Sequence, residues 1–335
     1  MIRPRRGAGR LWPVDTSTAA GLAAGYLADR VFADPRRWHP VAGFGQMAVR
    51  AEKALWRDKR TAGVVYTAGL VGGAGALGLL AERAAKRPWQ KAALTAVTTW
   101  AVLGGRSLEL EGTAMTSRLA QALTHGDLEP ARQRLSHLCS RDATHLTADE
   151  LARATVESLA ENTSDAVTAP LLWGAVAGVP GLLVYRAANT LDAMVGYRSP
   201  RYENFGWASA RLDDVLNYVP ARVNALLTVA VAPFVGGSSR SAWRTWRRDA
   251  AVHPSPNAGP VEASAAGALG VRLGGVNSYE GASENRGTLG DGREPSLAEL
   301  PGALRLTKLV GAGSLAVAVL LAAARGAIDA KVRVR

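Results

Sequence analysis

The chain has 335 residues, with 40 Lys and Arg against 28 Asp and Glu, so its formal net charge is +12. Hydrophobic residues make up 48% and charged residues 20%, which excludes wholesale disorder, because disorder requires low hydrophobicity and high charge. The single cysteine excludes an internal disulfide framework and a cysteine-based zinc site.

Apolar residues gather in blocks along the chain. Residues 61–81 form 21 residues without a charge and residues 166–185 form 20, the second block containing Pro170 and Pro180. A bilayer core of about 30 Å needs about 20 apolar residues as a helix, so both blocks have the length to cross it. Shorter blocks occupy residues 14–32, 92–105, 223–239 and 309–324.

Buried helices of a soluble protein are the alternative reading of these blocks. Several blocks in one chain, with six glycines in the first, favour a membrane protein instead. Small residues let helices approach closely in lipid, whereas each glycine costs up to about 1 kcal/mol relative to alanine in a soluble helix. We therefore expect an all-α, polytopic protein of the cell membrane, with one membrane-embedded domain over residues 1–335.

Polar segments separate the blocks, and we expect their helices and loops on the cytoplasmic side. Residues 106–165 are predicted to be helical, with capping-box spacing from Thr147 to Glu150. Residues 240–300 are rich in Gly, Pro and Ser and show little periodicity, which is typical of a linker or a functional loop region. The basic N-terminus favours a cytoplasmic location, but both ends of the 61–81 block are basic, so topology stays open.

Acidic residues line one face of the helix that precedes residue 166. Glu157, Glu161 and Asp165 are spaced i, i+4 and i+8, which places them close together, with Asn162 beside them. Three carboxylates on one face repel each other unless a cation or a hydrogen-bond donor lies among them. A solvated acidic face is the alternative interpretation.

A second polar group lies between the apolar blocks, and ionisable groups at membrane segments are functional candidates by default. Its acids are suited to Mg²⁺, which prefers carboxylates, waters and phosphate oxygens, and its arginines to an anion. Ion pairs at helix ends are the alternative. The group contains Asn189, Thr190, Asp192, Arg211, Asp213, Asp214, Asn217 and Arg222.

Other chemistry is weakly indicated. Residues 253–262, HPSPNAGPVE, and the glycines at 274 and 275 allow backbone amides to approach a phosphate, although a structural turn explains them equally. We find no Ser-His-Asp triad and no Gly-Lys-Ser/Thr phosphate loop. Basic residues do not alternate with aromatics in a stripe, so the positive charge favours membrane lipid and anionic substrates, with no nucleic-acid partner.

Five strings, in order, resemble the CbiB/CobD adenosylcobinamide-phosphate synthase family, which consists of integral membrane enzymes of the cobalamin pathway. The resemblance is dense over about 25–45 and 140–290 and thin over 50–135 and after 300. The strings are DRVFADPRRWHPV, ESLAENTSDAVTAPLLW, YRAANTLDAMVGY, RYENFGWASARLDDVLNYVPAR and HPSPNAGPVEASAAGALGVRLGG.

The resemblance implies an amide ligation. A propionate carboxyl of adenosylcobyric acid would join the amine of aminopropanol or its phosphate, with ATP as co-substrate and Mg²⁺ as cofactor. The corrinoid and the amino-alcohol are the implied partners, and a homo-oligomer or a partner subunit stays open.

Motif matching carries the family's functional positions to this chain, without assigning individual roles. The matched residues are Glu157, Glu161, Asn162 and Asp165, then Asn189, Thr190, Asp192 and Met194, then Arg211, Asp213, Asp214, Asn217, Pro220 and Arg222, and finally Ser255, Pro256, Asn257, Gly259 and Glu262. Ala193 replaces a frequent serine, and residues 278–281 resemble a further tyrosine-glycine motif. On chemical grounds we expect Glu157, Glu161, Asn162 and Asp165 to be catalytic and Asp213 and Asp214 to hold the metal. The remaining polar residues are expected to bind substrate.

Two other function classes stay open. A membrane prenyl- or alcohol-phosphate transferase would use Asp213 and Asp214 for a magnesium diphosphate, although such enzymes usually carry a second aspartate-rich motif. A non-enzymatic membrane sensor of the same superfamily would not need these acids for turnover.

Overall fold

The computed structural model describes residues 16–34, 39–197, 199–279 and 282–334, and nearly all of its regular structure is helical. Two π-helical turns, η1 (Ser164–Thr168) and η2 (Asp192–Gly196), interrupt the longest helical run. The helices are α1 (Ser17–Phe32), α2 (Pro40–Leu55), α3 (Arg60–Ala84), α4 (Pro88–Val102), α5 (Gly105–His125), α6 (Glu129–Leu135), α7 (Ala148–Thr163), α8 (Ala169–Leu191), α9 (Trp207–Val231), α10 (Ser239–Asp249), α11 (Ala258–Leu269) and α12 (Leu300–Val334). Short 3-10 turns are η3 (Ala232–Val235), η4 (Ala250–Val252) and η5 (Leu297–Glu299), and β1 (Leu273–Tyr279) pairs antiparallel with β2 (Ala282–Leu289).

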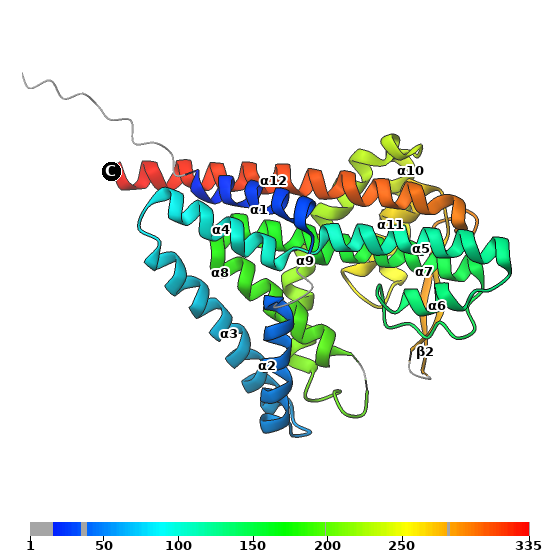
Figure 1. The fold of residues 1–335 in the computed structure, drawn as a ribbon, viewed down its shortest axis with the longest axis horizontal. Coiled ribbons are helices and arrows are strands. Elements are labelled where there is room, and N and C mark those ends of the chain that lie inside the picture. Colours follow the sequence, from blue (N-terminus) through cyan, green and yellow to red (C-terminus); the bar gives the residue numbers. More distant parts are fainter. Residues whose placement is uncertain (1–15, 35–38, 198, 280–281, 335) are drawn as a thin grey trace, which may run out of the picture.

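Four helical stretches among the described residues have the length and apolar composition to cross a membrane. They are Arg60–Ala84, Ala148–Gly196, Trp207–Val235 and Leu297–Ala327. The predicted all-α polytopic class is therefore confirmed. In Figure 1, α12 extends along the whole molecule, beside α1 at one end and near α10 and α11 at the other.

The apolar block at 166–185 does not form one straight spanning helix, which corrects the sequence-based expectation. Tyr185 Oη lies 3.1 Å from the carbonyl oxygen of Asp165, although 20 residues of straight helix would separate them by about 30 Å. The reversal occurs at Gly178, which has φ +66° and is followed by Pro180. The amide of Val179, freed by the turn, donates to Glu82 Oε1 at 2.8 Å. The block is thus a helical hairpin, and its second arm returns to the side of Asp165, where the first arm begins.

Close helix contacts explain the small residues of the apolar half. A Cβ at Gly21 or Gly25 of α1 would collide with Thr95 or Thr99 of α4, so the glycines allow the two helices to touch. Many large apolar side chains on α1, α3, α4, α9 and α12 remain exposed, including Val31, Leu80 and Leu320. Such faces are expected where lipid replaces water.

The predicted polar helical segment at 106–165 contains α5, α6 and α7. Thr147 and Glu150 form the capping box at the start of α7. Apolar residues of α5, α6, α7, α11, α12 and the paired strands β1 and β2 form one buried cluster, which includes Met115, Leu135 and Leu151.

Residues 240–300 are more ordered than their composition indicated. Instead of a loop region they contain α10, α11 and the β-hairpin. Their glycines mark helix contacts and strand bends: Gly267 lies against α10, and Gly274 and Gly275 have φ of +81° and +88°. The alanine-rich α11 is almost completely buried, which explains its lack of amphipathic periodicity.

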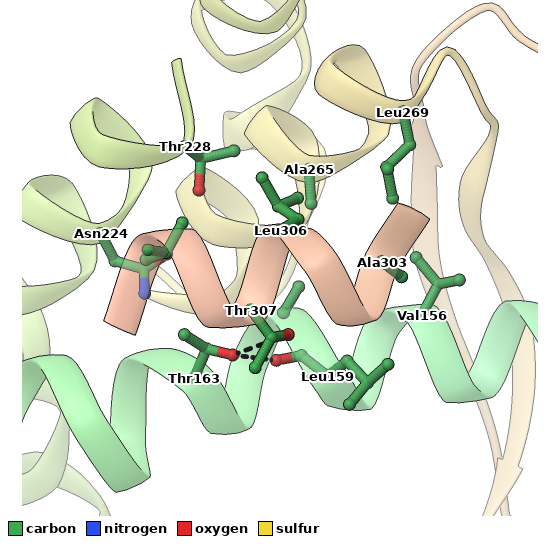
Figure 2. A pocket seen from close by; sticks show the side chains of 12 residues that line it. Val156, Leu159, Thr163, Asn224, Thr228, Ala265, Leu269, Ala303, Leu306 and Thr307 are labelled. Atoms are coloured by element: carbon green, nitrogen blue, oxygen red, sulfur yellow. Dashed lines mark hydrogen bonds between the residues drawn. The ribbon is translucent and has the colours of Figure 1, made fainter. Parts of the chain in front are cut away.

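Hydroxyl groups connect α12 to η1 and α9 through the core. Thr168 Oγ1 lies 2.9 Å from Ser314 Oγ and accepts from Asn224 Nδ2 at 3.0 Å. Next to them, Thr163 donates to Leu159 O and to Thr307, as Figure 2 shows. The cavity lined by Thr163, Asn224, Thr307 and their apolar neighbours measures about 10 Å³, which is enough for one water molecule but not for a substrate.

Candidate functional site

The hairpin of α8 brings together polar residues that are far apart in the sequence. Asn189 Nδ2 lies 3.3 Å from both Asp165 Oδ2 and Asp213 Oδ1. Asn217 Nδ2, one turn after Asp213, donates to Asp213 Oδ2 at 2.9 Å, and Tyr185 Oη donates to Asn217 Oδ1 at 2.9 Å. The amides and the phenol therefore hold two carboxylates from η1 and α9 in fixed positions.

Two further acids complete this group, which we call the junction cluster: Glu161, Asp165, Asp192 and Asp213. Glu161 and Asp192 lie close enough to Asp213 and Asp165 for mutual repulsion. Within the described ranges, no Lys, Arg or His forms a salt bridge to any of the four. Asn donors alone offset little of this charge, so the cluster favours a bound cation or ammonium group.

The donor chemistry of the junction cluster fits Mg²⁺. In the part of the chain that the structure describes, no three His, Cys, Asp or Glu side chains are arranged to hold a metal ion by themselves. Mg²⁺ is usually bound through one or two carboxylates, with waters and substrate phosphates completing its shell. Asp213 and Asp165, which share Asn189, supply that number of carboxylates.

The predicted metal pair, Asp213 and Asp214, is divided by the helix. Neighbouring residues of an α-helix point about 100° apart. Asp213 points into the junction cluster, whereas the partly exposed Asp214 pairs with Arg211, its Oδ2 lying 3.6 Å from the guanidinium. The structure therefore groups Asp213 with Asp165 more closely than with its sequence neighbour.

The guanidinium of Arg222 already has hydrogen-bond and ring contacts within the protein. Its guanidinium lies 3.5 Å from the ring centroid of Tyr218 and donates to Tyr218 O at 2.8 Å. It also donates to Asn257 Oδ1 and Pro256 O, both at 3.1 Å. Asn257 Nδ2 in turn donates to the carbonyl of Asp214 at 2.8 Å. Arg222 and Asn257 thus fasten the loop before α11 to α9.

Three predicted site residues make local hydrogen bonds outside the junction cluster. Thr190 Oγ1 donates to Arg186 O, and Asn162 Nδ2 donates to Ser158 O. Ser255 Oγ accepts from the amides of Asn257 and Ala258 at the start of α11. Residues 280–281 of the predicted tyrosine-glycine motif lie outside the described residues.

The acidic face of α7 continues away from the junction cluster into a buried group of charges. Glu157 forms an ion pair with Arg141 and accepts from the Gly274 amide at 2.7 Å. Glu262 is 0% exposed, and neither of its carboxylate oxygens has a hydrogen-bond partner in the described structure. His253 Nε2 and Arg286 Nη1 each lie 3.7 Å from Glu262 Oε1. Burial, followed by the charges of Glu157 and Glu161, raises the pKa of Glu262 well above its ordinary value.

The sequence analysis missed Arg186 and the residues around it. The Arg186 guanidinium donates to the carbonyl of Val102 at the end of α4 and to Asn189 Oδ1 at 3.3 Å. It also interacts electrostatically with Asp34 and Asp165. An arginine beside an apolar block was the available signal. Arg186 therefore joins the N-terminal acidic motif to the junction cluster.

Asp29 belongs to the same neighbourhood and marks the end of α1. Its Oδ2 accepts from the Arg106 amide at the start of α5 at 3.0 Å. Asp34 N donates to Ser107 Oγ at 3.2 Å, and His39 Nε2 lies 3.5 Å from Asp34 Oδ1. Residues 35–38 of the corresponding N-terminal string lie outside the described residues.

A membrane-embedded helical protein with a polar junction at the ends of its apolar helices is the class that this fold defines. The family model described as "CobD/Cbib protein" matches residues 22–307. The chain belongs to the CobD/Cbib family.

Relatives agree with this family assignment over nearly their whole length. A cobalamin biosynthesis protein CobD of Mycobacterium tuberculosis is 54% identical over 303 residues, which cover 90% of this chain and 95% of the relative. Proteins of the same name from Geobacter metallireducens and Chromobacterium violaceum are 44% and 41% identical, over 84% and 92% of this chain and 89% and 99% of their own lengths. No solved structure matches the chain.

Proposed function

We propose that this protein acts in cobalamin biosynthesis as a multi-pass ligase of the cell membrane. It would join a propionate carboxyl of adenosylcobyric acid to the amine of aminopropanol or aminopropanol phosphate, using ATP. The family assignment and the names of the relatives support the pathway. The grouping of four acids in the junction cluster is the observation that supports the reaction class, because none of them forms a salt bridge with a basic side chain among the described residues.

The chemistry requires activation of a poor acyl acceptor. The substrate carboxylate attacks the γ-phosphorus of ATP, which forms an acyl phosphate and releases ADP. The amine then attacks the acyl carbon and expels inorganic phosphate, so the C–N bond forms as the C–O bond breaks. The protein must place three anionic groups and remove protons from an ammonium.

The junction cluster provides groups for these tasks. Asp165 and Asp213 would hold Mg²⁺, which supplies charge neutralisation for the ATP phosphates. Asn189 and Asn217 keep these carboxylates in position. Arg186 is the cation beside the cluster that can face an anion, although it already binds backbone and amide oxygens.

Glu161 is the proposed base for the ammonium. It belongs to the junction cluster and interacts electrostatically both with Asp165 of that cluster and with the buried Glu262. A carboxylate can take a proton from the ammonium as a general base. Glu161→Gln should flatten the rise of kcat with pH. An unchanged pH profile with only a higher KM would make Glu161 a binding residue.

Complementation tests the proposed step. A strain that lacks this step grows with cobinamide but not with cobyric acid, and the gene should restore growth on cobyric acid. Asp213→Asn should fail to restore growth while the protein still accumulates in the membrane. Equal rescue by wild type and Asp213→Asn would favour a non-enzymatic role for the cluster, and failure of both would reject the proposed step.

A further inference from the structure

We propose that α10 is an interfacial helix that rests on an anionic lipid surface. This surface lies outside the junction cluster, and the proposal does not depend on the proposed ligase reaction. α10 has the sequence SRSAWRTWRRD, so arginine and tryptophan alternate along it. These 11 residues are an exception to the expectation from the sequence that basic and aromatic residues are not interleaved.

Three arginines and a tryptophan of α10 share one exposed face. Ala242, Thr245 and Asp249 are buried, and Ala242 and Thr245 pack on Gly267 of α11. The opposite face presents Arg240, Trp243, Arg244 and Arg247, all exposed and spaced i, i+3, i+4 and i+7. Trp243 is 46% exposed and stacks edge-on against Trp246, with ring centroids 5.1 Å apart.

The exposed arginines are not neutralised by the protein. Arg248 binds Asp249 and Asp291, and this ion pair, with the Gly290 amide, holds the pKa of Asp249 below its usual range. In contrast, no salt bridge in the described part of the chain engages Arg240, Arg244 or Arg247. The exposed face of α10 therefore carries three arginines without salt bridges to the described residues, beside the exposed indole of Trp243.

The position of α10 identifies lipid as its partner. α10 begins only a few residues after the membrane-crossing stretch Trp207–Val235 ends. Val215, Val219 and Leu226 form an exposed apolar face on α9, and the 61% exposed Phe234 continues it to the end of the stretch. Figure 1 shows α10 at the edge of the molecule, where its outer side is uncovered. Tryptophan is enriched at the membrane interface, and clustered arginines attract anionic headgroups.

A spin label on α10 tests this proposal in the full-length protein. Cys139→Ser removes the single cysteine, and Ser239→Cys then places one label at the start of α10. Ser117→Cys, on the exposed side of α5, serves as the matched aqueous position. Both proteins are reconstituted into nanodiscs of phosphatidylcholine alone or with phosphatidylglycerol, and the label's accessibility to oxygen and to a nickel chelate is measured.

We expect the label at 239, but not the label at 117, to become less accessible to the nickel chelate when phosphatidylglycerol is present. High salt should reverse the change, because screening weakens exposed charge interactions. The triple change Arg240→Gln, Arg244→Gln and Arg247→Gln should abolish it. The charge-matched change Arg83→Gln, Lys86→Gln and Arg87→Gln, in the link between α3 and α4, should leave it intact.

Three results would overturn the proposal. Equal accessibility of both labels in every lipid would place α10 in water. The same protection in pure phosphatidylcholine, or in the triple α10 variant, would show that anionic lipid is not the partner. Protection that persists in detergent would assign the face to a protein contact, such as a second copy of the chain.

Discussion

Glu262 offers a direct test of whether the buried charges are there for function. Glu262→Gln keeps the size of the side chain and removes its charge. The carboxylate is fully buried, neither oxygen accepts a hydrogen bond, and the side chains of His253 and Arg286 lie 3.7 Å from Oε1. The charged form is therefore poorly compensated in the folded protein.

The sign of the pH dependence follows from the raised pKa of Glu262. The folded protein binds a proton at this carboxyl more tightly than the unfolded chain, whose glutamate pKa is about 4.3. The free energy of unfolding therefore falls as pH rises above about 4, by at most about 1.4 kcal/mol per pH unit, until pH passes the folded-state pKa. Between pH 5 and pH 7 the loss is at most about 3 kcal/mol.

Thermal unfolding in detergent measures this effect. The melting temperature of Glu262→Gln should exceed that of the wild type by several degrees at pH 7, with the difference shrinking toward pH 5. Glu203→Gln, which removes the same charge from an exposed position, should show no such trend. The ligase activity of Glu262→Gln should fall, since a stabilising change in a functional site commonly costs activity.

Two results would refute this reasoning. A difference in melting temperature that does not vary with pH would mean that the Glu262 carboxyl does not titrate between its folded and unfolded states. A wild type that is more stable than Glu262→Gln at pH 8 would mean that the surroundings of Glu262, with Arg286 among them, compensate its charge fully.

Three further predictions concern the hairpin, the junction cluster and the loop before α11. Gly178→Ala should lower the melting temperature, because a residue with a Cβ pays about 1–3 kcal/mol at φ +66° and the new methyl group would collide with Glu82. Gly72→Ala, which adds a methyl group in open space, should not lower it. Equal melting temperatures of the two variants would contradict the sharp turn at Gly178. In a Mg²⁺ titration, Asp213→Asn should reduce turnover about 10- to 100-fold more than Asp214→Asn, since only Asp213 shares Asn189 with Asp165. Equal losses in the two variants would instead indicate that Asp213 and Asp214 together form the metal site. Arg222→Lys should lower activity equally with aminopropanol and with aminopropanol phosphate, because lysine cannot make both hydrogen bonds that Arg222 donates to Asn257 and Pro256. A loss confined to the phosphorylated amine would instead assign Arg222 to phosphate binding.

The sequence predicted the membrane class well, because that class depends on composition over long stretches. The block at 61–81 lies within the 25-residue helix α3, and the Thr147 and Glu150 spacing marks the start of α7. The i, i+4, i+8 spacing correctly placed Glu157, Glu161 and Asp165 on one side of the α7–η1 run, where they face the buried charges and the junction cluster. These features are local, so the chain's own periodicity determines them.

Features that depend on a distant partner were not predictable. The turn at Gly178 is stabilised by Glu82, 97 residues from Val179, and without it Asn189 would not reach Asp165. The role of Arg186 depends on the end of α4, and Glu262 is buried by elements from three parts of the chain. Within residues 240–300, β-pairing and the burial of α11 were concealed by glycine and alanine, which carry little periodic signal.

The central claim, ligation through an acyl phosphate, is tested most directly with adenosylcobyric acid labelled with ¹⁸O in its free carboxyl group. The purified, reconstituted protein is incubated with this substrate, aminopropanol phosphate, ATP and Mg²⁺, and the products are analysed by mass spectrometry. We predict one amide and one ADP per turnover, with one ¹⁸O atom transferred to inorganic phosphate. Transfer of ¹⁸O to AMP would show that the intermediate is an acyl adenylate and not an acyl phosphate. If folded, membrane-inserted protein forms no amide, the proposed activity itself is contradicted.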